Sequence, residues 1–67
     1  MTIYEEKDIN PDSYYSLQKL IRGQWMYCSG EYSCIKGEDI PDALEKERNA
    51  KYADPSEKGE WRIVDCN

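Results

Sequence analysis

The segment SYYSLQKLIRG (Ser13–Gly23) decides the fold, because it fits either a helix or a strand. Tyr14, Leu17 and Ile21 have helical spacing, whereas Tyr15 shares one side of a strand with the same leucine and isoleucine. Propensity is divided as well, since tyrosine and isoleucine favour strands while leucine, glutamine and lysine favour helices. On the residues alone, both alternatives stay open.

The sequence before this segment predicts an edge strand and a turn. Residues 2–9, TIYEEKDI, alternate loosely and have charged residues at their centre, which is typical of an edge strand. Asn10–Ser13, NPDS, has proline and aspartate at the second and third positions of a β-turn. A hairpin would follow if Ser13–Gly23 is a strand. The rival is a helix capped by Asp12 or Ser13.

Two shorter segments follow. Gln24–Cys28, QWMYC, is apolar and aromatic, and we expect it to be buried. Ser29–Gly37 has the features of one or two helical turns. Ser29 is the expected cap, and Gly37 is expected to end the helix in the left-handed conformation.

The segment KGEDIPDALEKERNAKYA (Lys36–Ala53) predicts a longer helix. Asp39 suits the N-cap, and Pro41 falls in the first turn, where its missing N–H costs nothing. After a loop, Glu60–Cys66 alternates between apolar and polar residues and predicts a strand. The helix would pack through a narrow stripe of mostly small side chains: Ile40, Ala43, Leu44, Glu47, Ala50 and Ala53.

Length and charge restrict the class of protein. The 67 residues (1–67) are enough for one domain, whose aromatic bulk comes from two Trp and six Tyr. The net charge of −5 disfavours contact with nucleic acid or anionic membranes and favours a basic protein partner. No apolar stretch is long enough for a signal peptide or a membrane span, so we expect a soluble, cytoplasmic protein.

The sequence offers little for catalysis or metal binding. Cys28, Cys34 and Cys66 are an odd number of cysteines in a chain expected to be cytoplasmic, so free thiols are predicted. The chain has no histidine, no paired cysteine motif and no glycine-rich phosphate loop. We therefore predict a binding protein rather than an enzyme, with no metal and no cofactor.

The second half of the chain resembles a family of small phage and mobile-element proteins, the type I-F anti-CRISPRs. The likeness includes a Gly-x-x-aliphatic-Pro step, an Asn-Ala-Lys-x-Ala run and a Gly-Glu-Trp before the last strand. Upstream, Asn10–Asp12 matches the family's turn and Tyr32 lies at a matching distance before the step. The matching residues downstream are Gly37, Ile40, Pro41, Ala43, Glu47, Asn49, Ala50, Lys51, Ala53, Gly59, Glu60, Trp61 and Val64.

The resemblance implies an α+β fold of order β-β-α-α-β. An N-terminal hairpin and a C-terminal strand would form a three-stranded antiparallel sheet, and two helices would pack on it. Tyr14–Arg22 would then be the second strand, with Asn10–Ser13 as the hairpin turn.

The resemblance also implies a function. The family binds the large subunit of the Csy surveillance complex, occupies the basic site that grips the PAM, and blocks loading of target DNA. Asp12 matches an acidic contact of the family, Tyr32 an aromatic one and Ile40 an aliphatic one. Two neighbouring acidic contacts of the family fall at Ser33 and Cys34 here. We expect three nearby acidic residues to compensate: Glu31, Glu38 and Asp39.

The same acidic surface suits other roles. One alternative is a phage inhibitor of another host nucleic-acid-binding machine, such as a polymerase, nuclease or restriction enzyme. Another is a small interaction module, for instance a homodimer formed through Trp25, Met26 and the tyrosines. We expect a monomer that binds a protein with a basic DNA-binding surface and makes no direct contact with nucleic acid or membrane.

Overall fold

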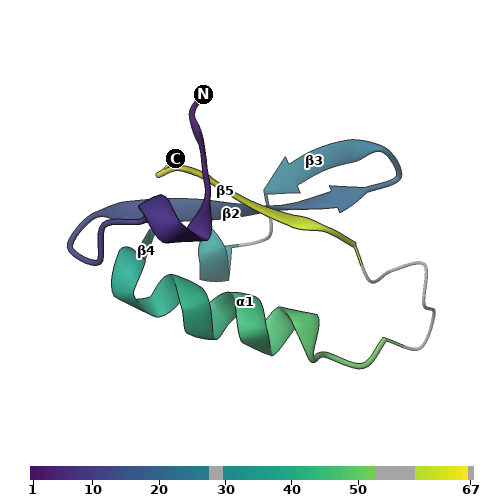
Figure 1. Cartoon of the computed structure of the whole chain (residues 1–67). Coiled ribbons are helices and arrows are strands. Elements are labelled where there is room, and N and C mark those ends of the chain that lie inside the picture. Colours follow the sequence, from purple (N-terminus) through teal and green to yellow (C-terminus); the bar gives the residue numbers. More distant parts are fainter. Residues whose placement is uncertain (28–29, 53–58, 67) are drawn as a thin grey trace.

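A computed structural model gives the arrangement of residues 1–27, 30–52 and 59–66. The described chain combines one α-helix with an antiparallel sheet, so the α+β prediction is confirmed. The elements follow in the order β1 (Ile3–Tyr4), the 3-10 turn η1 (Glu6–Asp8), β2 (Tyr14–Ile21), β3 (Gln24–Tyr27), the 3-10 turn η2 (Gly30–Tyr32), β4 (Ile35–Lys36), the 3-10 turn η3 (Gly37–Asp39), α1 (Ile40–Arg48) and β5 (Trp61–Asp65) (Figure 1).

Strand β2 lies at the centre of the sheet. It pairs antiparallel with β5 on one side, and with β3 and β4 on the other, while β1 pairs with the far side of β5. The ambiguous Tyr14–Arg22 segment is therefore a strand over Tyr14–Ile21. The predicted sheet of three strands is wrong, because the described residues form five.

The predicted N-terminal hairpin is also wrong. Asn10–Ser13 does form a turn, with the Ser13 N–H donating to the Asn10 carbonyl at 3.0 Å. The strand before it, however, covers only Ile3–Tyr4 and pairs with β5 instead of β2. The charged residues that follow form the 3-10 turn η1, which ends the strand early.

The hairpin of this fold is β2–β3. Its turn has two residues, Arg22 and Gly23, with φ angles of 51° and 79°. Two positive φ angles define the tight turn whose twist matches that of paired strands, and glycine adopts this conformation without strain. The expectation that Gln24–Cys28 is buried is wrong for the described part, because β3 lies at an edge and exposes Met26 and Tyr27.

The shorter predicted helix, Ser29–Gly37, does not form over its described residues. Between residues 30 and 37 the structure has only the turn η2 and the two-residue strand β4, whose Ile35 pairs with Tyr15. Gly37 begins η3 and does not have a positive φ. The remaining helix, α1, ends at Arg48 rather than near Ala53, which lies outside the described residues.

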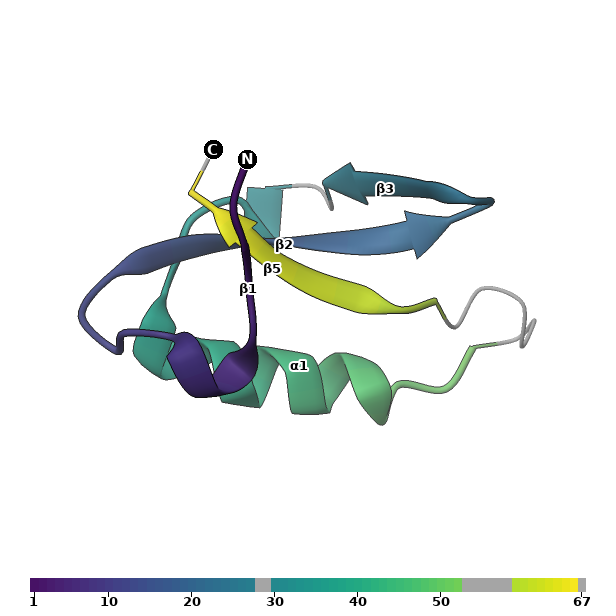
Figure 2. The same ribbon diagram turned by 45° about the horizontal axis from the view of Figure 1, so that its top comes forward.

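The core lies between α1 and one face of the sheet (Figures 1 and 2). Pro41 falls in the first turn of α1 as predicted, and Asp39 precedes the helix without a side-chain capping bond. Ile40 and Leu44, the two large residues of the predicted stripe, are fully buried against the sheet. Burying such side chains stabilises a fold by about 1.5–3 kcal/mol each. The buried apolar cluster contains Tyr15, Leu17, Tyr32, Ile40, Leu44 and Ile63.

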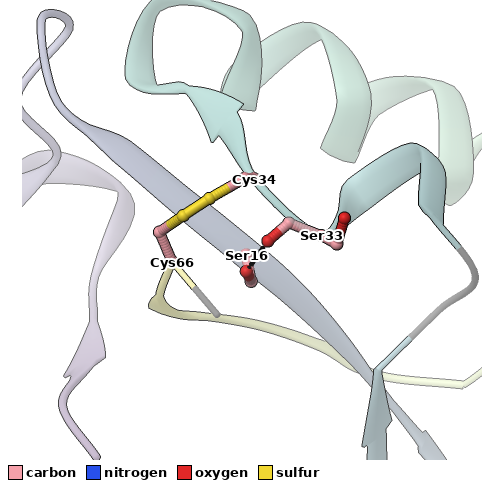
Figure 3. The surroundings of a disulfide bond; sticks show 4 residues. All are labelled: Ser16, Ser33, Cys34 and Cys66. Atoms are coloured by element: carbon pink, nitrogen blue, oxygen red, sulfur yellow. Dashed lines mark hydrogen bonds between the residues drawn. A yellow bond between two sulfur atoms is a disulfide. The ribbon is translucent and has the colours of Figure 1, made fainter.

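Cys34 and Cys66 form a disulfide, so the prediction of free thiols is wrong for these two residues; Cys28 lies outside the described residues. Tyr15 of β2 pairs with Asp65 of β5 on one side and with Ile35 of β4 on the other. Cys66 directly follows Asp65 in the sequence, and Cys34 directly precedes Ile35. Their Cα atoms are 5.1 Å apart. The disulfide crosses β2 beside Ser16, whose hydroxyl donates to the Ser33 carbonyl (Figure 3). It thus ties the chain end to the segment before β4.

Reduction should destabilise the protein. The two cysteines are 32 residues apart, and a cross-link over such a loop contributes about 3–4 kcal/mol by restricting the unfolded chain. We expect dithiothreitol to lower the urea midpoint of the wild type, and the Cys34→Ser, Cys66→Ser double variant to unfold at that lower midpoint with or without reductant. Identical midpoints for oxidised and reduced wild type would contradict this role.

The carboxylate of Asp65 holds the N-terminal segment on β5. It accepts the Tyr4 hydroxyl at 2.6 Å and the Thr2 N–H at 2.9 Å. The Tyr4 hydrogen bond is the main reason that the pKa of Asp65 lies below its usual value, and it raises the pKa of Tyr4. Since both bonds favour the ionised carboxylate, this anchor strengthens as the carboxyl loses its proton.

The stability of the protein should therefore depend on pH through Asp65. A folded pKa below the unfolded value of about 4 contributes stability that is present above pH 4 and is lost as the pH falls through the folded pKa. We expect Asp65→Asn to lower stability at pH 7 and to flatten its change between about pH 5 and 2. Urea unfolding across this range measures both effects, and Tyr4→Phe should act in the same direction. An unaltered pH profile in both variants would contradict the anchor.

Candidate functional site

Three predicted site residues belong to one exposed corner of the molecule, where the turn before β2 meets the start of α1. The Glu38 N–H donates to the Pro11 carbonyl at 3.2 Å, and the Gly37 N–H donates to the Ser13 carbonyl at 2.7 Å. The turn is stiffened internally, because the Asn10 side chain accepts the Asp12 N–H at 2.9 Å. We call the exposed residues Asp12, Glu38 and Asp39 the acidic corner.

Gly37 makes this corner possible. A side chain at this position would overlap the carbonyl group of Asn10 and press on Ile9, so only glycine allows the two backbones to approach so closely. The contact brings Asp12 next to two residues that follow it by more than 25 positions. Glycine is therefore required at this position because the backbones of Gly37 and Asn10 approach closely. It is not required for the left-handed conformation that the sequence suggested.

The charges of the corner are only partly compensated. Lys36 Nζ lies 3.7 Å from Glu38 Oε1, but both side chains are substantially exposed. Exposed ion pairs of this kind contribute little to the stability of a protein. Asp39 and Asp42 lie at the N-terminal end of α1, where the helix dipole favours negative charge. The helix start therefore stabilises carboxylates that remain accessible to a partner.

Glu31 is held elsewhere. Its carboxylate pairs with Lys46 on α1 at 3.5 Å, and both side chains are exposed. The Glu31 and Lys46 charges oppose each other at that point, so Glu31 adds less to an acidic surface than the sequence suggested.

Tyr32 and Ile40, which were expected to contact a partner, are core residues. Tyr32 is 7% exposed, and its hydroxyl donates to Glu47 Oε1 at 2.6 Å while its ring packs edge-on against Trp61. Ile40 has no exposed surface. Neither side chain is accessible to a partner in this structure, and their role as direct contacts stays a prediction. Ile40 supports the corner, because it anchors the helix that follows Asp39.

Sequence reasoning missed a polar cluster on the opposite face of the sheet. The guanidinium of Arg62 lies 4.5 Å from the centre of the Trp25 ring, and its Nε donates to Gln18 Oε1 at 2.6 Å. Gln18 is almost fully buried although α1 packs on the other face. The only signal in the sequence was the polar position of Arg62 within the alternating last strand.

A shallow groove lies at the other end of α1. It has a volume of about 380 Å³ and is crossed by the ion pair between Arg48 and Glu6. Its apolar lining includes Leu44, Trp61 and Ile63. The groove is separate from the acidic corner, which lies at the opposite end of the helix.

Within the described ranges, no cluster of three or more His, Cys, Asp or Glu residues is arranged to hold a metal ion. The same part of the chain has no helix of the length and hydropathy needed to cross a bilayer. Comparisons with protein-family models, with curated proteins and with solved structures gave no significant match to this chain.

The close contact at Gly37 should be essential to the acidic corner. We expect Gly37→Ala to cost about 1–3 kcal/mol of unfolding free energy, because the added methyl group forces the Asn10 carbonyl away. Glu38→Ala, a change at the neighbouring exposed position, should alter stability by no more than about 0.5 kcal/mol. Urea unfolding measures both variants, and wild-type stability of Gly37→Ala would contradict the contact.

Proposed function

We propose that this protein is a non-catalytic inhibitor that uses its acidic corner to occupy the DNA-binding site of a basic protein. The supporting observation is that Asp12, Glu38 and Asp39 are exposed on two segments joined by backbone hydrogen bonds. Because the two backbone segments are already held together, only the side chains have to be ordered when a partner binds, which lowers the entropic cost of association.

The chemistry of such a partner follows from the charge. A protein surface that grips a DNA backbone presents lysine and arginine side chains to phosphates. Carboxylates can make charge-assisted hydrogen bonds with the same groups and so exclude the nucleic acid. The net charge of −5 also favours rapid encounter with a basic site.

The target that we propose is the large subunit of the type I-F Csy complex, at the site that recognises the PAM. This part of the proposal rests on the resemblance of Gly37–Trp61 to the anti-CRISPR family. Burial of Tyr32 and Ile40 leaves Asp12 as the family-matched contact that is exposed, and Glu38 and Asp39 as its neighbours. An inhibitor of another host nucleic-acid-binding machine would use the same corner.

The proposed place of action is the host cytoplasm, where thiols are kept reduced. The disulfide between Cys34 and Cys66 lies at exposed residues, so its state in the cell is set by the surrounding redox potential. Binding should therefore be measured for both the oxidised and the reduced protein.

A charge-reversal experiment tests the acidic corner. The Asp12→Lys, Glu38→Lys double variant should bind the purified Csy complex at least about tenfold more weakly, because two attractive contacts become repulsive. The matched control is Glu5→Lys, Glu45→Lys, which makes the same change in net charge at exposed positions outside the corner. Calorimetric titration and competition with target DNA give the affinities, and circular dichroism confirms folding.

The outcomes separate the parts of the proposal. Equal weakening of both variants would show that only net charge matters and would contradict a defined corner. If the wild type, oxidised and reduced, leaves target-DNA binding unchanged at large excess, the Csy target is wrong. Capture of a different DNA-binding protein from a bacterial lysate, lost in the corner variant, would support the alternative target.

A further inference from the structure

The β2–β3 hairpin has a charge opposite to that of the whole protein. The sequence has 14 acidic and nine basic residues, yet no aspartate or glutamate lies between Ser13 and Gly30. This stretch carries Lys19 on β2 and Arg22 in the turn, and Arg62 on β5 lies over β3 through its contact with Trp25. Glu60, the residue before β5, lies on the far side of β2 from β3.

Strand β3 also has an unpaired edge. Within the described residues, β3 is the last strand on its side of the sheet and pairs only with β2. The register shows which of its backbone groups point outward. The Leu20 N–H donates to the Glu60 carbonyl at 2.9 Å, so Leu20 faces β5 and makes a non-hydrogen-bonded pair with Trp25.

The same hydrogen-bonding pattern recurs two residues earlier in β2. Gln18 faces β5 in the same way, and its partner on β3 is Tyr27. Trp25 and Tyr27 therefore direct their N–H and C=O groups away from β2, toward the open edge. These are the groups with which an added strand would pair.

Apart from its short length of four residues, this edge has no feature that normally prevents strand addition. Proteins protect edge strands with charged residues, proline or bulges, and Gln24–Tyr27 has none of these. Two of its side chains are accessible, since Met26 is 48% exposed and Tyr27 is 40% exposed. The tight turn and the Arg62 contact hold the strand in place, so a partner meets a preformed edge.

We propose that the outer edge of β3 binds an extended acidic peptide segment of a partner protein as an additional strand. Backbone groups at Trp25 and Tyr27 would supply the hydrogen bonds, and Arg22 and Arg62 would supply the complementary charge, whereas the Lys19 ammonium lies over the Tyr52 and Trp61 rings on the other side of β2. Main-chain pairing with flanking side-chain contacts is a recurrent mode of peptide recognition. The acidic corner takes no part in this interaction.

Other occupants fit the edge less well. A second copy paired antiparallel through β3 would bring two positively charged hairpins together. A single-stranded nucleic acid needs open aromatic faces, and one face of Trp25 is covered by Arg62. A nucleic acid also cannot use the row of outward backbone donors and acceptors as a peptide strand does.

The test uses two synthetic octapeptides, one alternating glutamate with valine and the other alternating lysine with valine. Amide chemical shifts of the full-length protein, recorded at about 150 mM salt, locate and quantify binding. We expect the glutamate peptide to shift the amides of Trp25 and Tyr27 most, and to bind at least about tenfold more tightly than the lysine peptide.

Variants separate the edge from the charge. Tyr27→Pro removes one outward N–H without removing a β2–β3 hydrogen bond, whereas Tyr27→Thr keeps that N–H and favours a strand. Arg22→Asn removes a positive charge and places a favoured residue at a positive φ, whereas Arg22→Lys keeps the charge. We expect Tyr27→Pro and Arg22→Asn to weaken binding at least about fivefold, and each control to change it by less than about threefold.

Several results would overturn the proposal. These are the absence of shifts at millimolar glutamate peptide, equal binding of both peptides, or strongest shifts away from β3. Binding of a ten-residue thymidine oligonucleotide to the same amides, with no peptide binding, would indicate a nucleic acid instead. A dimer in sedimentation that Tyr27→Pro abolishes would show that a second copy takes the edge.

Discussion

The fold depends on the pairing of β2 with β5. These strands are far apart in the sequence, and their ladder runs from Tyr15 opposite Asp65 to Lys19 opposite Trp61. At its centre Leu17 lies opposite Ile63, and both side chains are buried under α1. The remaining strands attach to one of these two, and the disulfide joins the end of the ladder to the segment before β4. Without β5, α1 would lose the part of its packing surface that Ile63 supplies.

Local sequence patterns predicted some of this arrangement. The alternation around Ile63 identified the last strand, and Ile40 with Leu44 identified the buried side of α1. The proline-containing turn at Asn10–Ser13 was also correct. Each of these features follows from side chains close together in the chain, whose spacing determines which side faces the core.

Long-range pairing could not be predicted in the same way. The turn before β2 suggested a hairpin there, yet the hairpin is formed by Arg22 and Gly23, a two-residue turn in which arginine takes an unusual positive φ. An apolar run such as Gln24–Tyr27 fits a buried strand and an exposed edge equally well, and its place in the sheet decides between them. Near Ile35, pairing with β2 replaced the predicted helix.

In the candidate site, too, local features could be predicted from the sequence and long-range contacts could not. Acidic residues at Glu38 and Asp39 were evident from the sequence, but their proximity to Asp12 depends on the close approach of Gly37 to Asn10. Tyr32 and Ile40 stand next to exposed acids in the sequence and nevertheless point into the core. In so small a protein, consecutive residues of a short turn alternate between surface and interior, so position in the chain does not determine accessibility.

Strand β2 also separates the two charged regions of the molecule. It begins at Tyr14, beside the acidic corner, and ends at Ile21, beside the basic turn. Eight residues of extended chain span about 26 Å. The screening length at physiological salt is about 8 Å, so the corner and the hairpin hardly affect each other's local potential. A net charge of −5 therefore does not describe the hairpin, whose own charged residues are Lys19 and Arg22.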